Sequence, residues 1–269
     1  MRWEWIVVVY TAYFAVVAWS RGYPAALKYG TIAALIAASL LVLLPAPIQT
    51  RQIALRQWLP LVLLLGGYRL SGFFFVAPMR SLEERLLAFD RRVFDAVGWK
   101  PSRVTRAPAL RATLELAYLL VYAMVPLGVA ALHLAGASSQ LPRYWTVVLA
   151  ACFASYAMLP WLQTRPPRVL ESLLAPDAAN PQADRTPLRR LNLAILRTSS
   201  IQVNTLPSGH VAAALAVALM VLASSPSAGM AFLALSVAIA IATVIGRYHY
   251  VVDTLAGVAV ALASWWWLG

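Results

Sequence analysis

Long apolar runs recur along the whole chain and constrain its fold more than any other feature. A helix needs about 20 apolar residues to cross the hydrocarbon core of a bilayer, and about 17 suffice. On this rule we predict eight membrane-spanning helices, over residues 4–20, 30–47, 57–78, 112–136, 143–163, 208–224, 228–246 and 250–268. The sequence is 61% hydrophobic and 12% charged, a balance outside that of soluble globular domains. We therefore expect an all-α, polytopic transmembrane helix bundle.

Two connections between these runs have the pattern of amphipathic helices that lie in the membrane interface. Residues 80–97 place apolar side chains on one face and arginines elsewhere. Residues 187–197 begin with Pro187, a residue suited to the first helical position, directly after Thr186, a residue suited to an N-cap. The preceding residues, 174–186, are rich in Ala, Pro and Asp and predict a surface loop.

The chain carries a net charge of +12, and its arginines gather between the apolar runs. This distribution suits anionic headgroups or phosphorylated substrates better than nucleic acid, for which the sequence has no binding module. Arg69 and Glu115 lie within predicted spans, where a charge is costly and marks a functional candidate. They are placed to neutralise one another; alternatively, each extends to the interface or forms a structural pair. The single Cys152 is expected to be a small buried hydrophobe.

Three polar segments hold the residues suited to chemistry: residues 164–168 (Thr-Arg-Pro-Pro-Arg), 206–210 (Leu-Pro-Ser-Gly-His) and 246–253 (Gly-Arg-Tyr-His-Tyr-Val-Val-Asp). One loop joins the fifth and sixth predicted spans. Two further crossings return the chain to the same side before the third segment. All three segments are therefore expected at one face of the membrane.

The second segment has the features of an anion site at the start of a helix. Pro207 presets the backbone, Gly209 allows a ligand to approach closely, and Ser208 adds a hydroxyl donor. The free N–H groups and the positive end of the helix dipole attract negative charge.

The other two segments supply cations and a paired histidine. Arg165, Arg168 and Arg247 offer planar donor groups that match phosphate oxygens. His249 and Asp253 are four residues apart, so the carboxylate is able to accept from one ring nitrogen and leave the other unprotonated. Such a histidine is a nucleophile or a base.

Each of these features alone is an ordinary helix start, helical contact or interface anchor. Together, on one face and in a chain with 3 histidines, they indicate an active site. Asp253 is the only carboxylate in the three segments, so we expect no metal and no other cofactor.

The segments resemble the three signature motifs of the type 2 phosphatidic acid phosphatase superfamily of membrane enzymes. The family pattern is a lysine and an Arg-Pro pair, then Pro-Ser-Gly-His, then an arginine followed by His-x-x-x-Asp. The resemblance covers roughly residues 57–268. It implies a phosphatase-like six-helix catalytic core over residues 57–269, after an N-terminal transmembrane hairpin over residues 1–56.

The resemblance also implies roles for individual residues. The residues that match are Arg165 with Pro166 in the first motif, Ser208, Gly209 and His210 in the second, and Arg247, His249 and Asp253 in the third. By this match His249 attacks phosphorus, Asp253 orients it, and His210 protonates the leaving oxygen. In the family no metal takes part.

Two departures from the family pattern bear on the reaction. Met158 stands where the first-motif lysine is expected, and Arg247 precedes the third-motif histidine by two residues rather than six. These forms look more like the branch that includes inositol phosphorylceramide synthases and their bacterial relatives. In that case Arg168 takes over the work of the lysine, and the acceptor is either water or an alcohol.

We expect a lipid phosphatase that hydrolyses a lipid phosphate or diphosphate through a phosphohistidine. One alternative is a lipid phosphotransferase that moves a phospho-headgroup to an alcohol. Another is a transporter or binding protein in which the arginines hold a headgroup without chemistry. The expected partners are a phosphorylated lipid and the surrounding membrane lipids; the substrate lipid and the oligomeric state stay open.

Two arguments disagree about which side of the cell membrane carries the site. On the eight-span count, the catalytic face holds most of the Lys and Arg residues, and the positive-inside rule makes that face cytoplasmic. The family resemblance places it outside. Long loops and interfacial helices weaken the charge rule, so we favour the extracytoplasmic face.

Overall fold

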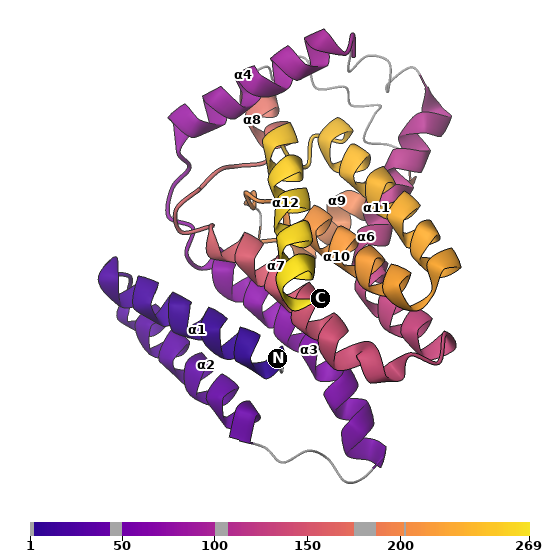
Figure 1. The fold of residues 1–269 in the computed structure, drawn as a ribbon. Coiled ribbons are helices and arrows are strands. Elements are labelled where there is room, and N and C mark those ends of the chain that lie inside the picture. Colours follow the sequence, from indigo (N-terminus) through magenta and orange to yellow (C-terminus); the bar gives the residue numbers. More distant parts are fainter. Residues whose placement is uncertain (1–2, 44–49, 100–106, 175–186, 202) are drawn as a thin grey trace.

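The computed structural model describes residues 3–43, 50–99, 107–174, 187–201 and 203–269. Within these ranges the regular structure is helical (Figure 1). Its helices are α1 (Trp3–Ser20), α2 (Ala25–Leu43), α3 (Thr50–Gly72), α4 (Arg80–Ala96), α6 (Pro108–Leu134), the 3₁₀ helix η1 (Ser138–Gln140), α7 (Leu141–Ala157), α8 (Pro167–Leu174), α9 (Pro187–Ser199), α10 (Gly209–Ser224), α11 (Pro226–Ile245) and α12 (Val251–Leu268). The predicted all-α class is confirmed.

The predicted membrane-spanning segments coincide with helices. Each of the eight apolar runs falls largely on one of α1, α2, α3, α6, α7, α10, α11 and α12. Five of these helices are long and apolar enough to cross a bilayer, namely α1, α2, α6, α11 and α12, whereas the apolar α10 is shorter. The chain is thus consistent with a multi-pass membrane protein, and the number of spans stays a prediction.

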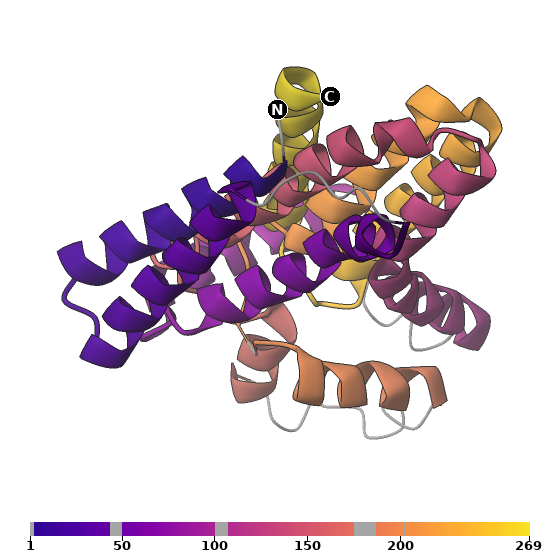
Figure 2. The same cartoon turned by 90° about the horizontal axis from the view of Figure 1, so that it is seen from below.

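The two segments predicted as interfacial helices are helical, as α4 and α9, and their position in the membrane interface stays a prediction. The predicted loop over residues 174–186 lies outside the described residues except for Leu174, which ends α8. Figure 1 shows α4 across one end of the bundle, and Figure 2 shows α8 and α9 below the long helices.

The centre of the bundle is α10, which packs against α6, α7, α11 and α12. Its buried positions are mostly small, among them Ala212, Ala214 and Ala216, so neighbouring helix backbones approach closely. One such close approach is at Gly257 of α12, where a Cβ would lie only 2.7 Å from the carbonyl oxygen of Ser208. Glycine at this position therefore brings the start of α12 against the start of α10.

The first two helices form an antiparallel hairpin beside the rest of the bundle (Figures 1 and 2). The ring of Tyr10 stacks on Phe153 of α7 at a centroid distance of 4.0 Å. The Tyr10 hydroxyl donates to the carbonyl of Gly67 in α3 at 2.7 Å. The hairpin thus contacts α3 and α7 directly.

Candidate active site

The three polar segments of the sequence meet at one end of the bundle. Backbone hydrogen bonds tie them in pairs: Asn204 N–H to Thr164 C=O at 2.9 Å, Ser208 N–H to Asp253 C=O at 2.9 Å, and Arg168 N–H to Arg247 C=O at 3.1 Å. Since every pair of segments is joined, the relative positions of their side chains are fixed by the backbone.

Two histidines and an aspartate form a continuous polar chain within this junction. His249 Nδ1 lies 3.4 Å from Asp253 Oδ2, and His249 Nε2 lies 3.2 Å from His210 Nδ1. An ionised carboxylate only accepts hydrogen bonds, so the Nδ1–H tautomer of His249 faces Asp253. The unprotonated Nε2 of His249 then accepts from His210 Nδ1–H. The nucleophile expected from the sequence thus has its lone pair turned toward the second histidine.

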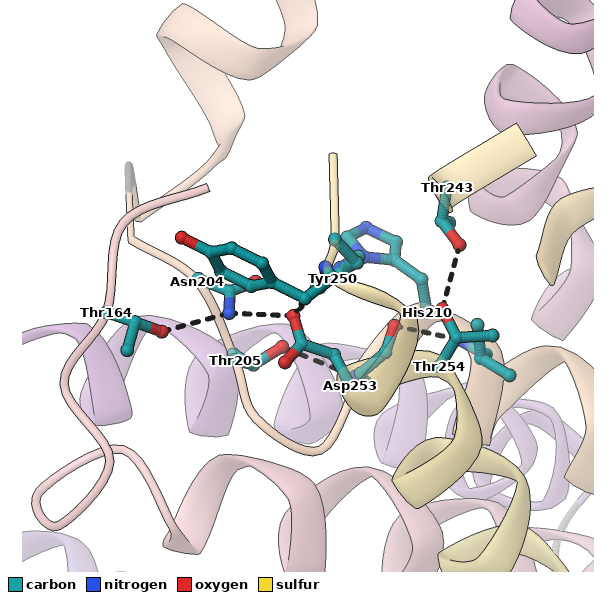
Figure 3. A network of polar contacts seen from close by, with 12 residues as sticks. Thr164, Asn204, Thr205, His210, Thr243, Tyr250, Asp253 and Thr254 are labelled. Atoms are coloured by element: carbon teal, nitrogen blue, oxygen red, sulfur yellow. Dashed lines mark hydrogen bonds and ion pairs between the residues drawn. The ribbon is translucent and has the colours of Figure 1, made fainter. Parts of the chain in front are cut away.

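Asp253 is held by a residue that the sequence did not point to. Its Oδ2 accepts from Asn204 Nδ2 at 2.8 Å and from the backbone N–H of Tyr250 at 3.0 Å (Figure 3). The Asn204 amide also lies 3.0 Å from the Thr164 hydroxyl. Asn204 and Asp253 are both buried. The only sequence signal for Asn204 was a polar residue three positions before Pro207, which is too common to single out.

Two of the predicted phosphate ligands are already paired with carboxylates. The guanidinium of Arg165 binds both carboxylate oxygens of Glu83 in α4, at 3.0 and 2.7 Å. The guanidinium of Arg247 binds Asp90 of α4 at 2.6 Å and Glu171 of α8 at 2.7 Å. Arg247 also adopts a φ of 57°, which costs a non-glycine residue about 1 kcal/mol or more. Both arginines therefore stabilise the loops around the histidines.

The carboxylates of α4 respond differently to their partners. Burial alone would raise the pKa of Glu83, but the hydrogen bonds and charge of Arg165 outweigh it and hold that pKa below 4.5. For Asp90, burial outweighs the N–H of Val251 and the charge of Arg247, so its pKa is raised. Glu83 is thus the carboxylate whose ionised form the folded protein favours.

We expect Glu83→Gln to destabilise the protein by about 1–3 kcal/mol at neutral pH, because it leaves Arg165 without its ionic partner. Since the pKa of Glu83 is lowered on folding, the stabilisation is present above about pH 4.5 and is lost as pH falls through the lowered value. The difference in melting temperature between wild type and variant in detergent should therefore shrink below pH 4.5. Glu84→Gln, on the exposed side of the same turn, is the matched control. A pH-independent difference would contradict the assignment.

The third predicted arginine, Arg168, lies at a cavity instead. The cavity has a volume of about 180 Å³, and Arg168, His210, His249, Tyr118 and Tyr248 are among its lining residues. Among the described residues, no carboxylate pairs with the Arg168 guanidinium. Burial lowers the pKa of Arg168, so an anion in the cavity would relieve an electrostatic cost. Of the three arginines predicted to bind phosphate, Arg168 is therefore the one placed to bind an anion in the cavity.

The second polar segment is engaged mainly in local contacts. Ser208 is buried and is the N-cap of α10, where its hydroxyl accepts from the Val211 N–H at 3.4 Å. The Gly209 N–H donates to the Thr205 hydroxyl at 3.3 Å, and Gly209 lines the cavity. The group that approaches Gly209 closely is the ring of Tyr156, with which a Cβ would collide. The close approach of a ligand expected at Gly209 stays a prediction.

Of the two alternatives for Arg69 and Glu115, the structure has the second: each finds a separate structural partner, and they do not neutralise one another. Glu115 pairs with Arg189 of α9 at 3.1 Å, and Arg69 donates to the Thr198 carbonyl at 3.0 Å. Both side chains therefore bind residues of α9. Nothing in the sequence indicated that α9 contacts the helices that carry Arg69 and Glu115. In the described ranges, no group of three or more His, Cys, Asp or Glu side chains is arranged to hold a metal ion.

Comparison with known proteins agrees with the assembled motifs. A family model described as the PAP2 superfamily matches residues 84–267, which is more than half of the chain and includes all three polar segments. No curated protein and no solved structure matches. The chain therefore belongs to the PAP2 superfamily, the type 2 phosphatidic acid phosphatases, whose members are phosphatases or phosphotransferases.

Proposed function

We propose that this protein hydrolyses a phosphate or diphosphate group on a lipid, without a metal ion, through a phosphohistidine at His249. Membership of the PAP2 superfamily supports lipid phosphate hydrolysis at a coarse level. The observation that carries the finer proposal is the chain Asp253, His249, His210 on the wall of a cavity that also presents Arg168.

The first step forms a phosphorus–nitrogen bond. A phosphate bound beside Arg168 displaces the contact between the histidines and meets the lone pair of His249 Nε2. As Nε2 attacks phosphorus, the bond from phosphorus to the lipid oxygen breaks. His210, which enters this step as the imidazolium beside the bound phosphate, donates a proton to the departing oxygen and becomes neutral. Asp253 stabilises the positive charge that develops on His249.

The second step regenerates the enzyme. His210, now deprotonated, accepts a proton from a water molecule that attacks phosphorus. The phosphorus–nitrogen bond breaks, the electron pair returns to His249 Nε2, and inorganic phosphate leaves. Each histidine thus ends in its starting protonation state.

The lining of the cavity supports a lipid as the substrate. Besides Arg168 and the histidines, it is lined by apolar side chains of four spans, including Leu61 and Leu64 of α3, Val121 and Val125 of α6, Cys152 of α7 and Ala213 of α10. One region therefore suits an anionic headgroup, and the region toward the bundle interior suits a hydrocarbon chain.

The phosphotransferase remains the second candidate, and it is the one favoured by the likeness to the inositol phosphorylceramide synthase branch. No carboxylate of the described residues lines the cavity, although carboxylates suit the hydroxyl groups of a polyol acceptor. We favour hydrolysis because water needs no second binding site. A non-catalytic transporter is disfavoured, because binding alone requires no histidine paired with a carboxylate.

The direct test is phosphate release by the purified protein in detergent from a panel of phosphorylated lipids, with chelator present. We expect release from at least one lipid at a rate unchanged by chelator, since arginine supplies the positive charge. Activity that disappears in chelator and returns with Mg²⁺ would contradict the metal-free mechanism. Phosphate transfer to an added alcohol in place of release would favour the second candidate.

We also propose that the site faces the extracytoplasmic side of the cell membrane. Ser172 of α8 is exposed near the site, and the native Cys152 is buried, so Ser172→Cys introduces one accessible thiol on the catalytic side. In intact cells this thiol should react with a membrane-impermeant maleimide. Labelling that requires lysis of the cells would place the site in the cytoplasm.

A further inference from the structure

A buried carboxylate lies outside the three motifs, next to the cavity. Glu115 of α6 accepts hydrogen bonds from the Tyr248 hydroxyl at 2.8 Å, from Arg189 Nη1 at 3.1 Å and from the side-chain amide of Asn192. Arg189 and Asn192 belong to α9, and Tyr248 immediately precedes His249. Glu115 thus joins a membrane span, an interfacial helix and the catalytic loop.

Tyr248 connects this carboxylate to the phosphate end of the cavity. Its ring stacks on Tyr118 at a centroid distance of 3.7 Å and an interplanar angle of 12°. The guanidinium carbon of Arg168 lies 5.0 Å from the centroid of the same ring. An aromatic ring attracts a guanidinium, so the position of the Tyr248 ring influences the position of Arg168. The Tyr248 hydroxyl donates to Glu115 at 2.8 Å and accepts from Arg189 Nη1 at 2.5 Å, and Glu115 in turn holds Arg189, so Glu115 takes part in both contacts that fix this ring.

Charge balance gives Glu115 a second effect on Arg168. The guanidinium carbon of Arg189 lies 5.4 Å from the Tyr248 ring, so two arginines lie near one ring. Glu115 compensates the charge of Arg189. Loss of the Glu115 charge makes the surroundings of Arg168 more positive, in a partly buried region where charges are poorly screened.

We propose that Glu115 is a positioning residue for the substrate phosphate: it holds the Tyr248 ring and neutralises Arg189, and thereby places the Arg168 guanidinium for an anion in the cavity. The inference rests on the proposed function. Packing α9 onto α6 would not by itself require a buried ion pair, since apolar residues of similar volume pack as well or better.

A double-mutant cycle tests the coupling between Glu115 and Arg168. Glu115→Gln, Arg168→Ala and the double variant are made in the full chain, and two quantities are measured: the affinity for inorganic phosphate by calorimetry, and kcat/KM for the lipid found by phosphate release. Glu115→Gln should weaken phosphate binding and kcat/KM about ten-fold, mostly through KM, when Arg168 is present. In the Arg168→Ala background the same change should cost less than about two-fold.

Equal losses in both backgrounds would overturn the inference. A purely structural role of Glu115 would lower phosphate affinity and kcat/KM by the same factor whether or not Arg168 is present. If Glu115→Gln fails to accumulate in the membrane, Tyr248→Phe replaces it in the cycle, since that change removes only the linking hydroxyl. Ser236→Ala, a buried change within α11, is the control and should leave both measurements unchanged.

The outcomes separate this inference from the proposed function. If Glu115 and Arg168 are coupled in phosphate binding but no lipid is hydrolysed, the proposed function is contradicted and the positioning role of Glu115 is supported. Hydrolysis with additive losses would contradict the positioning role alone. A protein that neither binds phosphate nor turns over a lipid would contradict both.

Discussion

His249→Ala should abolish turnover of every substrate, because it removes the ring nitrogen that attacks phosphorus, and His210 beside it serves as the proton donor. His210→Ala should behave differently, since a proton donor matters only when the leaving group is a poor one. With a lipid alkoxide as leaving group we expect a loss on the order of 10² to 10⁴. With nitrophenolate, which leaves without a proton, the loss should be far smaller.

The measurement is the ratio of rates for a lipid phosphate and for nitrophenyl phosphate in each variant. Because the two histidine rings lie side by side at 3.2 Å between nitrogens, a change at either one disturbs the same small volume. The substrate dependence is therefore the informative quantity. Equal losses on both substrates for His210→Ala, or residual turnover of the activated substrate by His249→Ala, would show that the roles are assigned wrongly.

Asp253→Asn should lower kcat on both substrates by about 10² to 10⁴, with little change in leaving-group dependence. An amide that donates to His249 Nδ1 would favour the tautomer with a proton on Nε2, which blocks the attacking lone pair. Asn204 already donates to the Asp253 carboxylate at 2.8 Å, so the substituted amide also faces a second amide donor.

Asn204→Asp provides the complementary test of this arrangement. It places two carboxylates against each other in a buried site, so the pair retains a proton to a higher pH. Because Asp253 must be ionised to orient His249, we expect activity to appear at a higher pH than in the wild type. Asn204→Ala should lower kcat less than Asp253→Asn, since it removes support for the aspartate and leaves its charge in place. An Asp253→Asn protein with a normal rate at neutral pH would exclude the tautomer argument.

The helices on the apolar runs were predictable, because the physical requirement for a membrane-spanning segment is simple. An uninterrupted apolar run of sufficient length identified the eight long helices, and amphipathic patterns identified α4 and α9. Counting crossings was also enough to bring His210 and His249 to one face, and the four-residue spacing anticipated the contact of His249 with Asp253. These inferences depend only on local periodicity and on the number of times the chain crosses the membrane.

The pairing of charges was not predictable in the same way. Arg165, Arg168 and Arg247 looked equivalent in the sequence, yet two of them meet carboxylates of α4 and one faces the cavity. Which arginine is paired depends on how the amphipathic face of α4 docks, and no local pattern encodes that. For Glu115 the sequence left open either Arg69 or another structural partner, and it could not show that the partner would be Arg189 of α9.

Glu83 and Asp90, the two carboxylates of α4 that bind arginines, fix the distance between the first and third polar segments. Glu83 and Asp90 are seven residues apart, about two turns or roughly 10 Å along one side of the helix. One holds an arginine of the first motif and the other an arginine of the third. A single helix thus acts as a spacer between two segments that are more than 80 residues apart in the chain. The rise of this helix between Glu83 and Asp90 sets the separation between Arg165 and Arg247.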